Sequence, residues 1–280
     1  MISVLQLGAL DYATGLRLQQ KLVELRKENR IGDVLLLLEH TPVITLGRNA
    51  KPTNILASPE LLARRGVEVS ECDRGGDVTF HGPGQLVGYP IIDLRARPSS
   101  DGKRKSLGAI EYVRRLEEVL IQVCADFGIP AKRICGLTGV WTSPDVMVQD
   151  AHVWTAAPGC PAERSSAPEA KIAAIGVHIS RAVTSHGFAL NVNTDLTYFD
   201  LIIPCGITAK PVTSMARELG RQVPLEEVAE SVSRNFGSVF ESKLLWKDSL
   251  EELIAGPEDV PLQVPENLRK MRGEEEIFRA

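Results

Sequence analysis

The sequence predicts an α/β fold, because short apolar segments of strand length accompany longer segments whose apolar residues have helical spacing. Residues 2–7 and 34–38 are apolar runs typical of buried strands. Between residues 107 and 127 apolar side chains recur every three or four positions, which predicts a helix packed on a sheet. Hydrophobic residues make up 44% and charged residues 24% of the chain, which excludes a disordered or fibrous protein.

Turn and capping signals delimit the elements of the first hundred residues. Asp11 is placed to cap a helix that follows the first strand. Ser58 and Pro59 predict the start of a second, brief helix. The strands expected in this part are 2–7, 34–38, 43–46, 67–72 and 86–94.

The second half begins with the helix expected at 107–127, which Gly128 and Pro130 should end. Its charged side chains are expected to face water; they are Arg114, Arg115, Glu117 and Glu118. KIAAIGVHIS and HGFALNV then predict strands, and the apolar FDLIIP predicts a strand end at Cys205. A last helix is expected at 224–239.

We expect a single domain over residues 1–245, followed by a charged tail over residues 246–280. Residues 142–170 contain several prolines and no sustained period, which predicts an inserted loop within the domain. The tail is acidic and contains prolines, which favours surface structure or partial disorder.

The charge and the cysteines restrict the class of function. A net charge of -4 gives no basic field for a nucleic acid, and the short basic run 103–105 suits a solvated loop. The five cysteines form no C-x-x-C pair, which argues against a zinc ribbon or a disulfide framework. No signal peptide and no apolar run of membrane-spanning length is visible, so we expect an intracellular protein with reduced thiols.

The segment from Arg74 to Gln85 is rich in glycine and also carries arginine, threonine, histidine and glutamine. Glycines let a backbone approach a ligand closely, so a binding loop is one interpretation. A glycine-rich hairpin turn with a core histidine is the other. The glycine spacing fits neither a dinucleotide fingerprint nor a phosphate loop.

Cys205 is a candidate nucleophile, because Pro204 and Gly206 flank it at the expected strand end. A cysteine attacks as its thiolate, so it needs a basic neighbour, for which Lys171, His178 and His81 are candidates. Each residue also has a purely structural interpretation. The cysteine could be a small core residue, the lysine a solvated strand flank, and His178 a hydrogen-bonded core histidine.

Residues 74–89, RGGDVTFHGPGQLVGY, resemble throughout the signature of the lipoyl(octanoyl) transferase family. KIAAIGVHIS, HGFALNV and the Pro-Cys-Gly around Cys205 fit the same pattern, which covers about residues 1–240 apart from the 142–170 insert. The resemblance implies a single mixed-sheet α/β (α+β) domain like that of biotin and lipoate protein ligases, with a sheet lining an acyl site.

The resemblance also implies roles for individual residues. Cys205 matches the family's nucleophile and Lys171 its catalytic lysine. Asp77 and Phe80 stand where the pattern tolerates variation. No metal or organic cofactor is implied. The residues matched to substrate binding are Arg74, Gly75, Gly76, Asp77, Val78, Thr79, Phe80, His81, Ala174, Ile175, Gly176, His178, Gly187, Phe188 and Ala189.

The implied reaction moves an octanoyl group from octanoyl-acyl carrier protein to a lysine of a lipoyl domain, the first step of protein lipoylation. The implied acceptors are lipoyl domains of 2-oxoacid dehydrogenase E2 subunits and the glycine cleavage H protein. Two other functions stay open: an ATP-dependent lipoate or biotin protein ligase, and a non-catalytic module that binds lipoyl domains. The long insert favours a eukaryotic source and hence mitochondria over a bacterial cytoplasm.

Overall fold

The computed structural model describes residues 1–95, 97–98, 104–143, 169–203 and 210–254. The described part of the large sheet consists of β1 (Ile2–Leu10), β2 (Asp33–His40), β6 (Gln85–Ile91), β9 (Ala131–Ile134), β10 (Leu137–Thr142), β11 (Lys171–Ser180), β12 (Val183–Asn191) and β13 (Leu244–Trp246). A smaller sheet consists of β3 (Val43–Leu46), β4 (Glu68–Glu71) and β5 (Val78–His81), and a two-stranded ribbon of β7 (Arg97–Pro98) and β8 (Arg104–Lys105). The helices are α1 (Tyr12–Lys27), α2 (Pro59–Arg64), α3 (Ala109–Asp126), α4 (Met215–Leu219), α5 (Leu225–Val239) and α6 (Leu250–Ile254), with the 3-10 helices η1 (Pro52–Asn54) and η2 (Leu196–Leu201).

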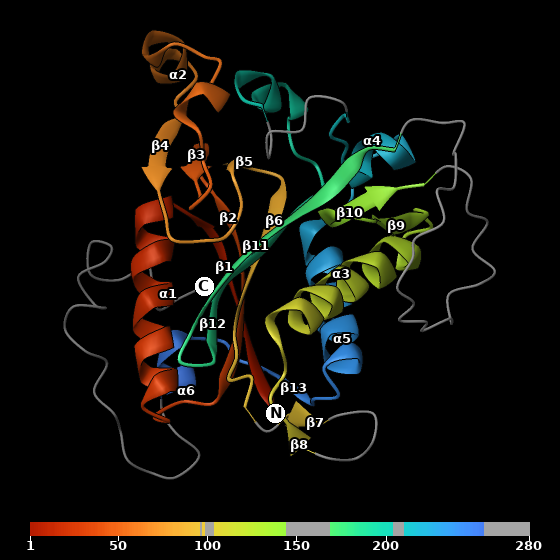
Figure 1. Ribbon diagram of the computed structural model, residues 1–280. Helices are drawn as coiled ribbons and strands as arrows, with labels where there is room; N and C mark the ends of the chain where they lie inside the picture. Colours follow the sequence, from red (N-terminus) through yellow and green to blue (C-terminus); the bar gives the residue numbers. More distant parts are fainter. Residues whose placement is uncertain (96, 99–103, 144–168, 204–209, 255–280) are drawn as a thin grey trace.

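The large sheet is mixed, with the strand order β13-β1-β2-β6-β12-β11-β10-β9. Strand β1 pairs in parallel with both β13 and β2, whereas the pairs from β2 to β9 are antiparallel. The small sheet lies beyond one end of these strands, above α1 in the view of Figure 1. The expected α/β class with a mixed sheet is therefore confirmed.

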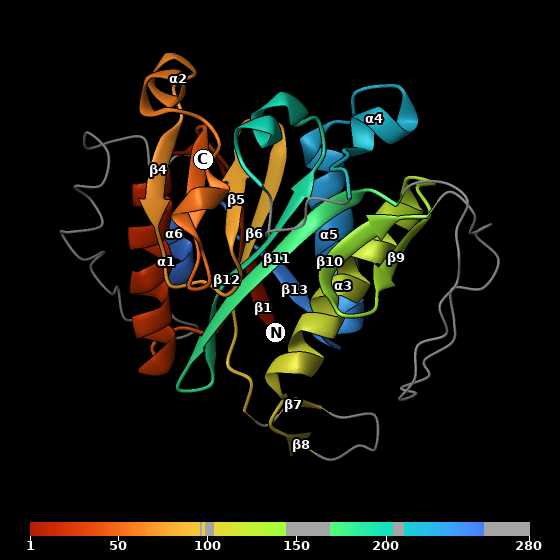
Figure 2. The same ribbon diagram turned by 45° about the horizontal axis from the view of Figure 1, so that its top comes forward.

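Both faces of the large sheet are buried, and helices cover them (Figure 1, Figure 2). Helices α3 and α5 pack on one face, where they share a core with Leu35 and Leu37. Helices α1 and α6 contribute to the core on the other face, which contains Leu36 and Leu38. Alternate residues of β2 thus serve opposite cores, which explains why its sequence is an uninterrupted apolar run.

The capping signals and most of the expected elements are present. The Asp11 carboxylate accepts a hydrogen bond from the N–H of Thr14 (2.8 Å) at the start of α1. Ser58 likewise caps α2, where its hydroxyl accepts from the N–H of Leu61 (3.3 Å). The expected helices at 107–127 and 224–239 correspond to α3 and α5.

The expectation that all four charged residues of α3 face water is wrong. The Glu117 side chain is fully buried and Arg115 is nearly so. The Glu117 carboxylate accepts hydrogen bonds from Arg114 (2.6 Å), Arg133 (3.2 Å) and the backbone N–H of Gly139 (3.1 Å). Strands β9 and β10 pack against this side of the helix, which the helical spacing alone does not reveal.

Two segments near the ends of expected elements also differ from the sequence-based description. Of the segment expected to lead into Cys205 as a strand, residues 199–201 lie in the 3-10 helix η2, which Asp195 caps, and Ile202 makes an isolated bridge to Ile55. Within the segment expected to be a tail, α6 buries Leu250 and Ile254 in the core beneath α1. Residues 144–168 of the expected insert and residues 255–280 lie outside the described residues.

Candidate functional site

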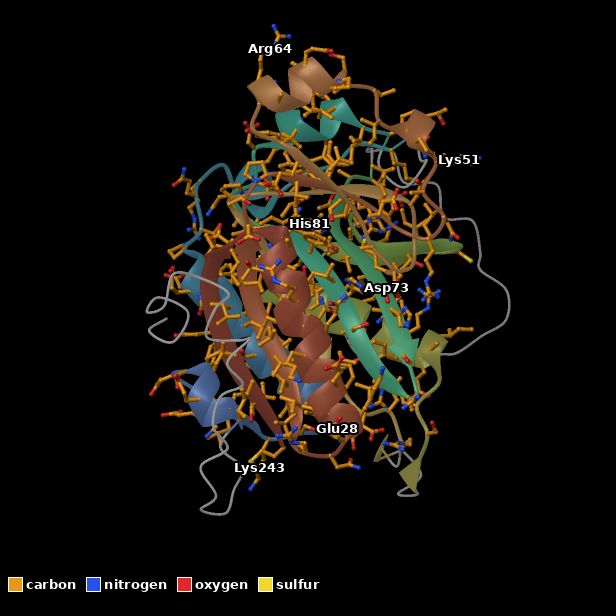
Figure 3. The ribbon with its side chains drawn as sticks, turned by 90° about the vertical axis from the view of Figure 1, so that its left-hand side faces the viewer. Glu28, Lys51, Arg64, Asp73, His81 and Lys243 are labelled. Atoms are coloured by element: carbon orange, nitrogen blue, oxygen red, sulfur yellow. The ribbon has the colours of Figure 1, made fainter. Side chains whose placement is uncertain are left out.

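A cavity of about 40 Å³ lies between the large sheet, the small sheet and the first turn of α1. Eleven of the residues matched to substrate binding line it together: Arg74, Gly76, Asp77, Thr79, His81, Ala174, Ile175, Gly176, Gly187, Phe188 and Ala189. Figure 3 shows His81 near the beginning of α1, above Asp73, which lies beside the β11–β12 hairpin. Residues far apart in the sequence therefore meet around one space.

Strands β11 and β12 leave room for the cavity because four of the six matched residues with which they line it are alanine or glycine. Ala174 pairs with Ala189, and Gly176 pairs with Gly187. At the two glycines the backbones are too close for a side chain. A Cβ on Gly176 would lie 2.7 Å from the Gly75 carbonyl oxygen, and one on Gly187 would lie 2.2 Å from that of Gly88. The floor of the cavity is thus nearly bare strand.

The loop before β5 forms one wall and is fixed by polar contacts. The buried Arg74 guanidinium donates to the carbonyl (2.7 Å) and hydroxyl (2.8 Å) oxygens of Thr45. The Gly75 N–H donates to the Val177 carbonyl (3.0 Å), which ties the loop to β11. The Asp77 carboxylate accepts from the Asn54 amide (2.6 Å) and holds the end of the loop.

Strand β5 divides its side chains between the cavity and a separate core. Thr79 and His81 face the cavity, whereas Val78 and Phe80 belong to the core beneath α2 and η2. The Phe80 ring stacks on Tyr198, with 4.7 Å between ring centroids. The structure therefore places Val78 and Phe80 behind the wall, where they support the loop and do not line the cavity.

His178 and Gly75 also fail to line this cavity. Gly75 contributes the backbone contact to β11 described above. His178 instead lines an outer groove beside α1, where its Nδ1 lies 3.0 Å from the Asp73 carboxylate and close to Arg48. The structure thus separates His178 from the other matched residues.

The hydrogen bonds around His81 determine which of its nitrogens carries the proton. The Asn191 side chain donates to the Thr213 carbonyl (2.9 Å), so its oxygen accepts from the Gln85 amide (2.8 Å). The Gln85 oxygen must then accept from His81 Nδ1 (2.7 Å), which leaves Nε2 as an acceptor. Burial, with His40 and Arg74 nearby, lowers the pKa of His81 to about 3, so the ring is neutral at neutral pH.

Lys171 is the first residue of β11 and is buried. Its Nζ lies 5.2 Å from the centroid of the Trp141 ring. The methylene stem passes over Gly139, where an added Cβ would lie 2.8 Å from Lys171 Cε. A second cavity of about 10 Å³ is lined by Lys171 and shares Thr79, Ala174 and Ala189 with the larger one. Lys171 therefore lines a space that adjoins the larger cavity along these three residues.

Cys205 lies outside the described residues, but the chain on both sides of it is held near the site. Before the cysteine, the Ile203 N–H donates to the Asn54 carbonyl (2.7 Å). After it, the Pro211 carbonyl accepts from the Lys171 N–H (2.8 Å). Asn54 also donates to Asp77, which lines the cavity. The chain before Cys205 is therefore attached to the cavity wall, and the chain after it is attached to Lys171.

Four cavity residues were not identified from the sequence: Tyr12, Val87, Tyr89 and His186. Val87, Tyr89 and His186 lie within the stretches that resemble the family pattern, and that resemblance could have identified them. No feature of the sequence marks Tyr12 on α1.

The His40 Nδ1–H can donate only to the Leu10 carbonyl (3.1 Å), so the Tyr89 hydroxyl donates to His40 Nε2 (2.7 Å). Burial raises the pKa of both Tyr12 and Tyr89, so both phenols are neutral.

His186 stands at the far end of the cavity from Lys171 and is bound by Asp73. Its Nε2 lies 2.7 Å from the Asp73 carboxylate. Burial would raise the pKa of Asp73, but this hydrogen bond and the two nearby histidines hold it below its usual value. Burial lowers the pKa of His186 although Asp73 opposes the shift.

Among the described residues, no group of three or more His, Cys, Asp or Glu side chains is placed to hold a metal ion.

Comparison with known families decides the relationship of the chain. Residues 11–237 match the model of the lipoyl protein ligase A/B catalytic domain, so the match spans most of the 280 residues. The chain belongs to the lipoyl protein ligase A/B catalytic domain family. All the residues that line the two cavities fall within the part that matches this family.

Relatives within the lipoyl protein ligase A/B family are highly similar over nearly the full length. An octanoyltransferase of Koribacter versatilis is 59% identical over 271 residues, which cover 97% of each chain. An octanoyltransferase of Acidobacterium capsulatum is 54% identical over 256 residues, which cover 91% of this chain and 96% of the relative. A chain from the structure of a bipartite lipoate protein ligase of Thermoplasma acidophilum has the same fold, with a TM-score of 0.61 at 15% identity over 88% of this chain and 87% of that chain.

The organisms of these relatives bear on the eukaryotic origin that we expected for this chain from its long insert. Both octanoyltransferases come from bacteria, so nothing supports the eukaryotic origin and mitochondrial location that the insert suggested. No helix among the described residues combines the length and apolar character needed to cross a bilayer.

Proposed function

We propose that this chain is an octanoyltransferase that works through an octanoyl thioester on Cys205. The two bacterial relatives, named octanoyltransferases, support the acyl group and the reaction class. One structural observation carries the proposal: Lys171 lines a space that shares Thr79, Ala174 and Ala189 with a cavity floored by small side chains. An alkyl chain on that floor would have its reactive end beside an amine.

In the first half-reaction, Lys171 Nζ takes the proton from the Cys205 thiol, and the thiolate attacks the carbonyl carbon of octanoyl-acyl carrier protein. The new carbon–sulfur bond forms as the bond to the carrier sulfur breaks. The carrier thiolate leaves and receives the proton held by Lys171. One thioester replaces another, so this half-reaction needs no external energy source.

In the second half-reaction, the uncharged ε-amine of a lysine on a lipoyl domain attacks the octanoyl thioester. Lys171 accepts a proton from the attacking nitrogen, the bond to Cys205 breaks, and the proton returns to the cysteine sulfur. The products are an octanoyl amide and free enzyme. An amide is more stable than a thioester, so the overall transfer proceeds without nucleotide hydrolysis.

Chain geometry supports the pairing of Cys205 with Lys171. Two residues of chain span at most about 7 Å, so the cysteine backbone stays close to Ile203, which is hydrogen-bonded to Asn54. The other end of the segment is bonded to Lys171 itself through Pro211. These two anchors favour a thiol that reaches the lysine end of the cavity.

The proposed donor is octanoyl-acyl carrier protein, and the proposed acceptors are lipoyl domains of 2-oxoacid dehydrogenase E2 subunits and the glycine cleavage H protein. In a bacterial cell the reaction would take place in the cytoplasm, where thiols stay reduced. An acceptor domain whose target lysine is replaced by arginine serves as the control, since it should leave the acyl-enzyme unconsumed.

The experiment that tests the proposal is the intact mass of the protein after mixing with octanoyl-acyl carrier protein. Wild type should gain one octanoyl group and lose it when a lipoyl domain is added. Cys205→Ala should gain none, whereas Cys135→Ala, a matched change at an exposed cysteine, should behave as wild type. Labelling of Cys205→Ala, or labelling that moves with Cys135, would refute the thioester on Cys205.

The competing function is an ATP-dependent ligase, which the shared fold with a lipoate protein ligase keeps in consideration. A ligase activates a free acid with a nucleotide, whereas the proposed transferase uses a thioester. The same mass experiment distinguishes them, because transfer from the carrier to a lipoyl domain should proceed at full rate without ATP. Transfer only from free octanoate plus ATP would favour the ligase.

A further inference from the structure

An outer groove of about 250 Å³ lies beyond the cavity, between α1 and the β11–β12 hairpin. Six α1 residues with the spacing of a single helix face form one side: Leu16, Gln19, Gln20, Val23, Glu24 and Lys27. Ser185 and His178 form the opposite side. Leu16 and Val23 are the apolar side chains of this helix face, and Gln19 and Gln20 lie between them.

His186 separates this groove from the cavity. Of the described residues, it alone lines both spaces. The side chain is only 4% exposed, because the Asp73 carboxylate holds Nε2 and the Tyr89 ring packs at 86° to the imidazole. The backbone is held as well, since the His186 N–H donates to the Gln19 side-chain oxygen.

The order of residues along β12 shows which way an acyl chain would run. Asn191 lines the small cavity with Lys171, Ala189 lines both cavities, and Gly187 lines only the larger one before His186 ends it. From Ala189, which lines both cavities, to His186 the strand extends by about 10 Å, close to the length of an extended octanoyl chain. A chain whose carbonyl lies beside Lys171 would therefore point its methyl end at the imidazole.

We propose that His186, held by Asp73, is the end wall of the acyl cavity and limits the length of the acyl chain that the enzyme accepts. This inference rests on the proposed acyl transfer and assigns its length selectivity to one side chain. Removing the imidazole would join the cavity to the outer groove, where Leu16 and Val23 can contact additional methylene groups.

The test is a competition between octanoyl and dodecanoyl carrier proteins, read as the ratio of the two acyl-enzymes by intact mass. The informative variant is His186→Gly, because His186 has φ +54°, which glycine adopts without strain. The ratio should shift toward the longer chain by roughly tenfold for each two methylene groups that become covered.

Two further variants make the result specific. Ser185→Ala changes a groove residue and leaves the wall in place, so its ratio should equal that of wild type. Asp73→Ala removes the hydrogen bond to the imidazole at a side chain that is 56% exposed, so the fold should tolerate it. Its ratio should shift in the same direction as that of His186→Gly, by a smaller factor, because the ring remains but is no longer held.

The outcomes separate the inference from the proposed function. If wild type gains no octanoyl group from the carrier, the proposed function fails. If wild type is acylated and folded His186→Gly keeps the wild-type ratio, the end wall is refuted. Should His186→Gly not fold, an unchanged ratio in Asp73→Ala refutes it, and a shift toward dodecanoyl supports it.

Discussion

The backbone of Lys171 is hydrogen-bonded to that of Pro211, whose carbonyl accepts from the Lys171 N–H at 2.8 Å. The Lys171 carbonyl in turn accepts from the Thr213 N–H (2.9 Å), so the two segments pair as a short parallel bridge. The chain that leaves the Cys205 segment is therefore attached to the residue proposed to exchange its proton. These bonds involve only the backbone of Lys171, so replacing its side chain tests the reactivity of the amine and leaves them in place.

Replacing Lys171 with alanine should lower the rate of Cys205 acylation by roughly 10²-fold or more, because the thiol loses its proton acceptor. Lys210→Ala is the matched control, since Lys210 Nζ lies 5.6 Å from the centroid of the same Trp141 ring and pairs with Glu169. Quenched time courses read by intact mass measure both rates. A near-normal rate in Lys171→Ala would remove this residue from the mechanism.

Glu117 should be important for stability although it is a polar residue on a helix. Glu117→Ala leaves the buried Gly139 N–H without its acceptor and empties a buried site, so we expect a loss of about 2–3 kcal/mol in the free energy of unfolding. Glu111→Ala on the same helix removes a carboxylate that is 56% exposed and should cost less than about 1 kcal/mol. Urea denaturation of both variants checks the difference, and equal losses would contradict it.

Gly88 should not accept a methyl group while Phe188 is present. A Cβ at Gly88 would lie 2.1 Å from the Phe188 ring, so Gly88→Ala should cost about 1–3 kcal/mol. Combining it with Phe188→Leu should recover part of that loss, because the ring edge is gone. Gly32→Ala is the control, as nothing lies within 4 Å of the added Cβ. Strictly additive losses in urea denaturation would show that the two residues do not compete for space.

Acid should destabilise the fold through the two buried histidines His40 and His81. Burial lowers the pKa of His40 to about 4, and that of His81 to about 3, whereas an unfolded histidine has a pKa near 6.5. Between these values the unfolded chain binds more protons, so the free energy of unfolding falls as the pH falls from 6.5 toward 4. Each histidine should contribute about 1 kcal/mol per pH unit.

The variant His40→Gln tests this origin of the acid sensitivity. Glutamine can still donate to the Leu10 carbonyl and accept from the Tyr89 hydroxyl, but it does not titrate. Urea denaturation across the same pH range should show that the free energy of unfolding changes less steeply with pH in the variant. The difference should be about 1 kcal/mol per pH unit, the contribution of one histidine. An identical slope in the variant would mean that His40 is not the group responsible.

The sequence predicted elements where a local pattern decides the structure. The apolar stripe of α3 and the Asp11 cap are properties of neighbouring residues, and both are present. Glu117 was misplaced because its partners Arg133 and Gly139 come from β9 and β10, which no spacing on the helix reveals. The segment FDLIIP is apolar enough for a strand, but its first three residues lie in η2, whose Leu201 contributes to the core beneath α2.

The cavity was predictable only in part, for a similar reason. The stretches from Arg74 to His81 and from Gly187 to Ala189 were found by resemblance, and the structure brings most of them together. Within β5, alternation sends Phe80 away from Thr79, a distinction that a contiguous match cannot make. Tyr12 was missed because its role depends on the first turn of α1 meeting His81, with 6.3 Å between the rings.

The bare floor made by Ala174, Ala189, Gly176 and Gly187 is hydrogen-bonded sheet rather than loop. Its shape is therefore already present before any ligand arrives, and binding requires little ordering of the protein there. The conformational entropy lost when an alkyl chain binds is then mainly that of the chain's own rotatable bonds. Preorganisation of this kind predicts that affinity will change more with the flexibility of the acyl group than with substitutions that loosen distant loops.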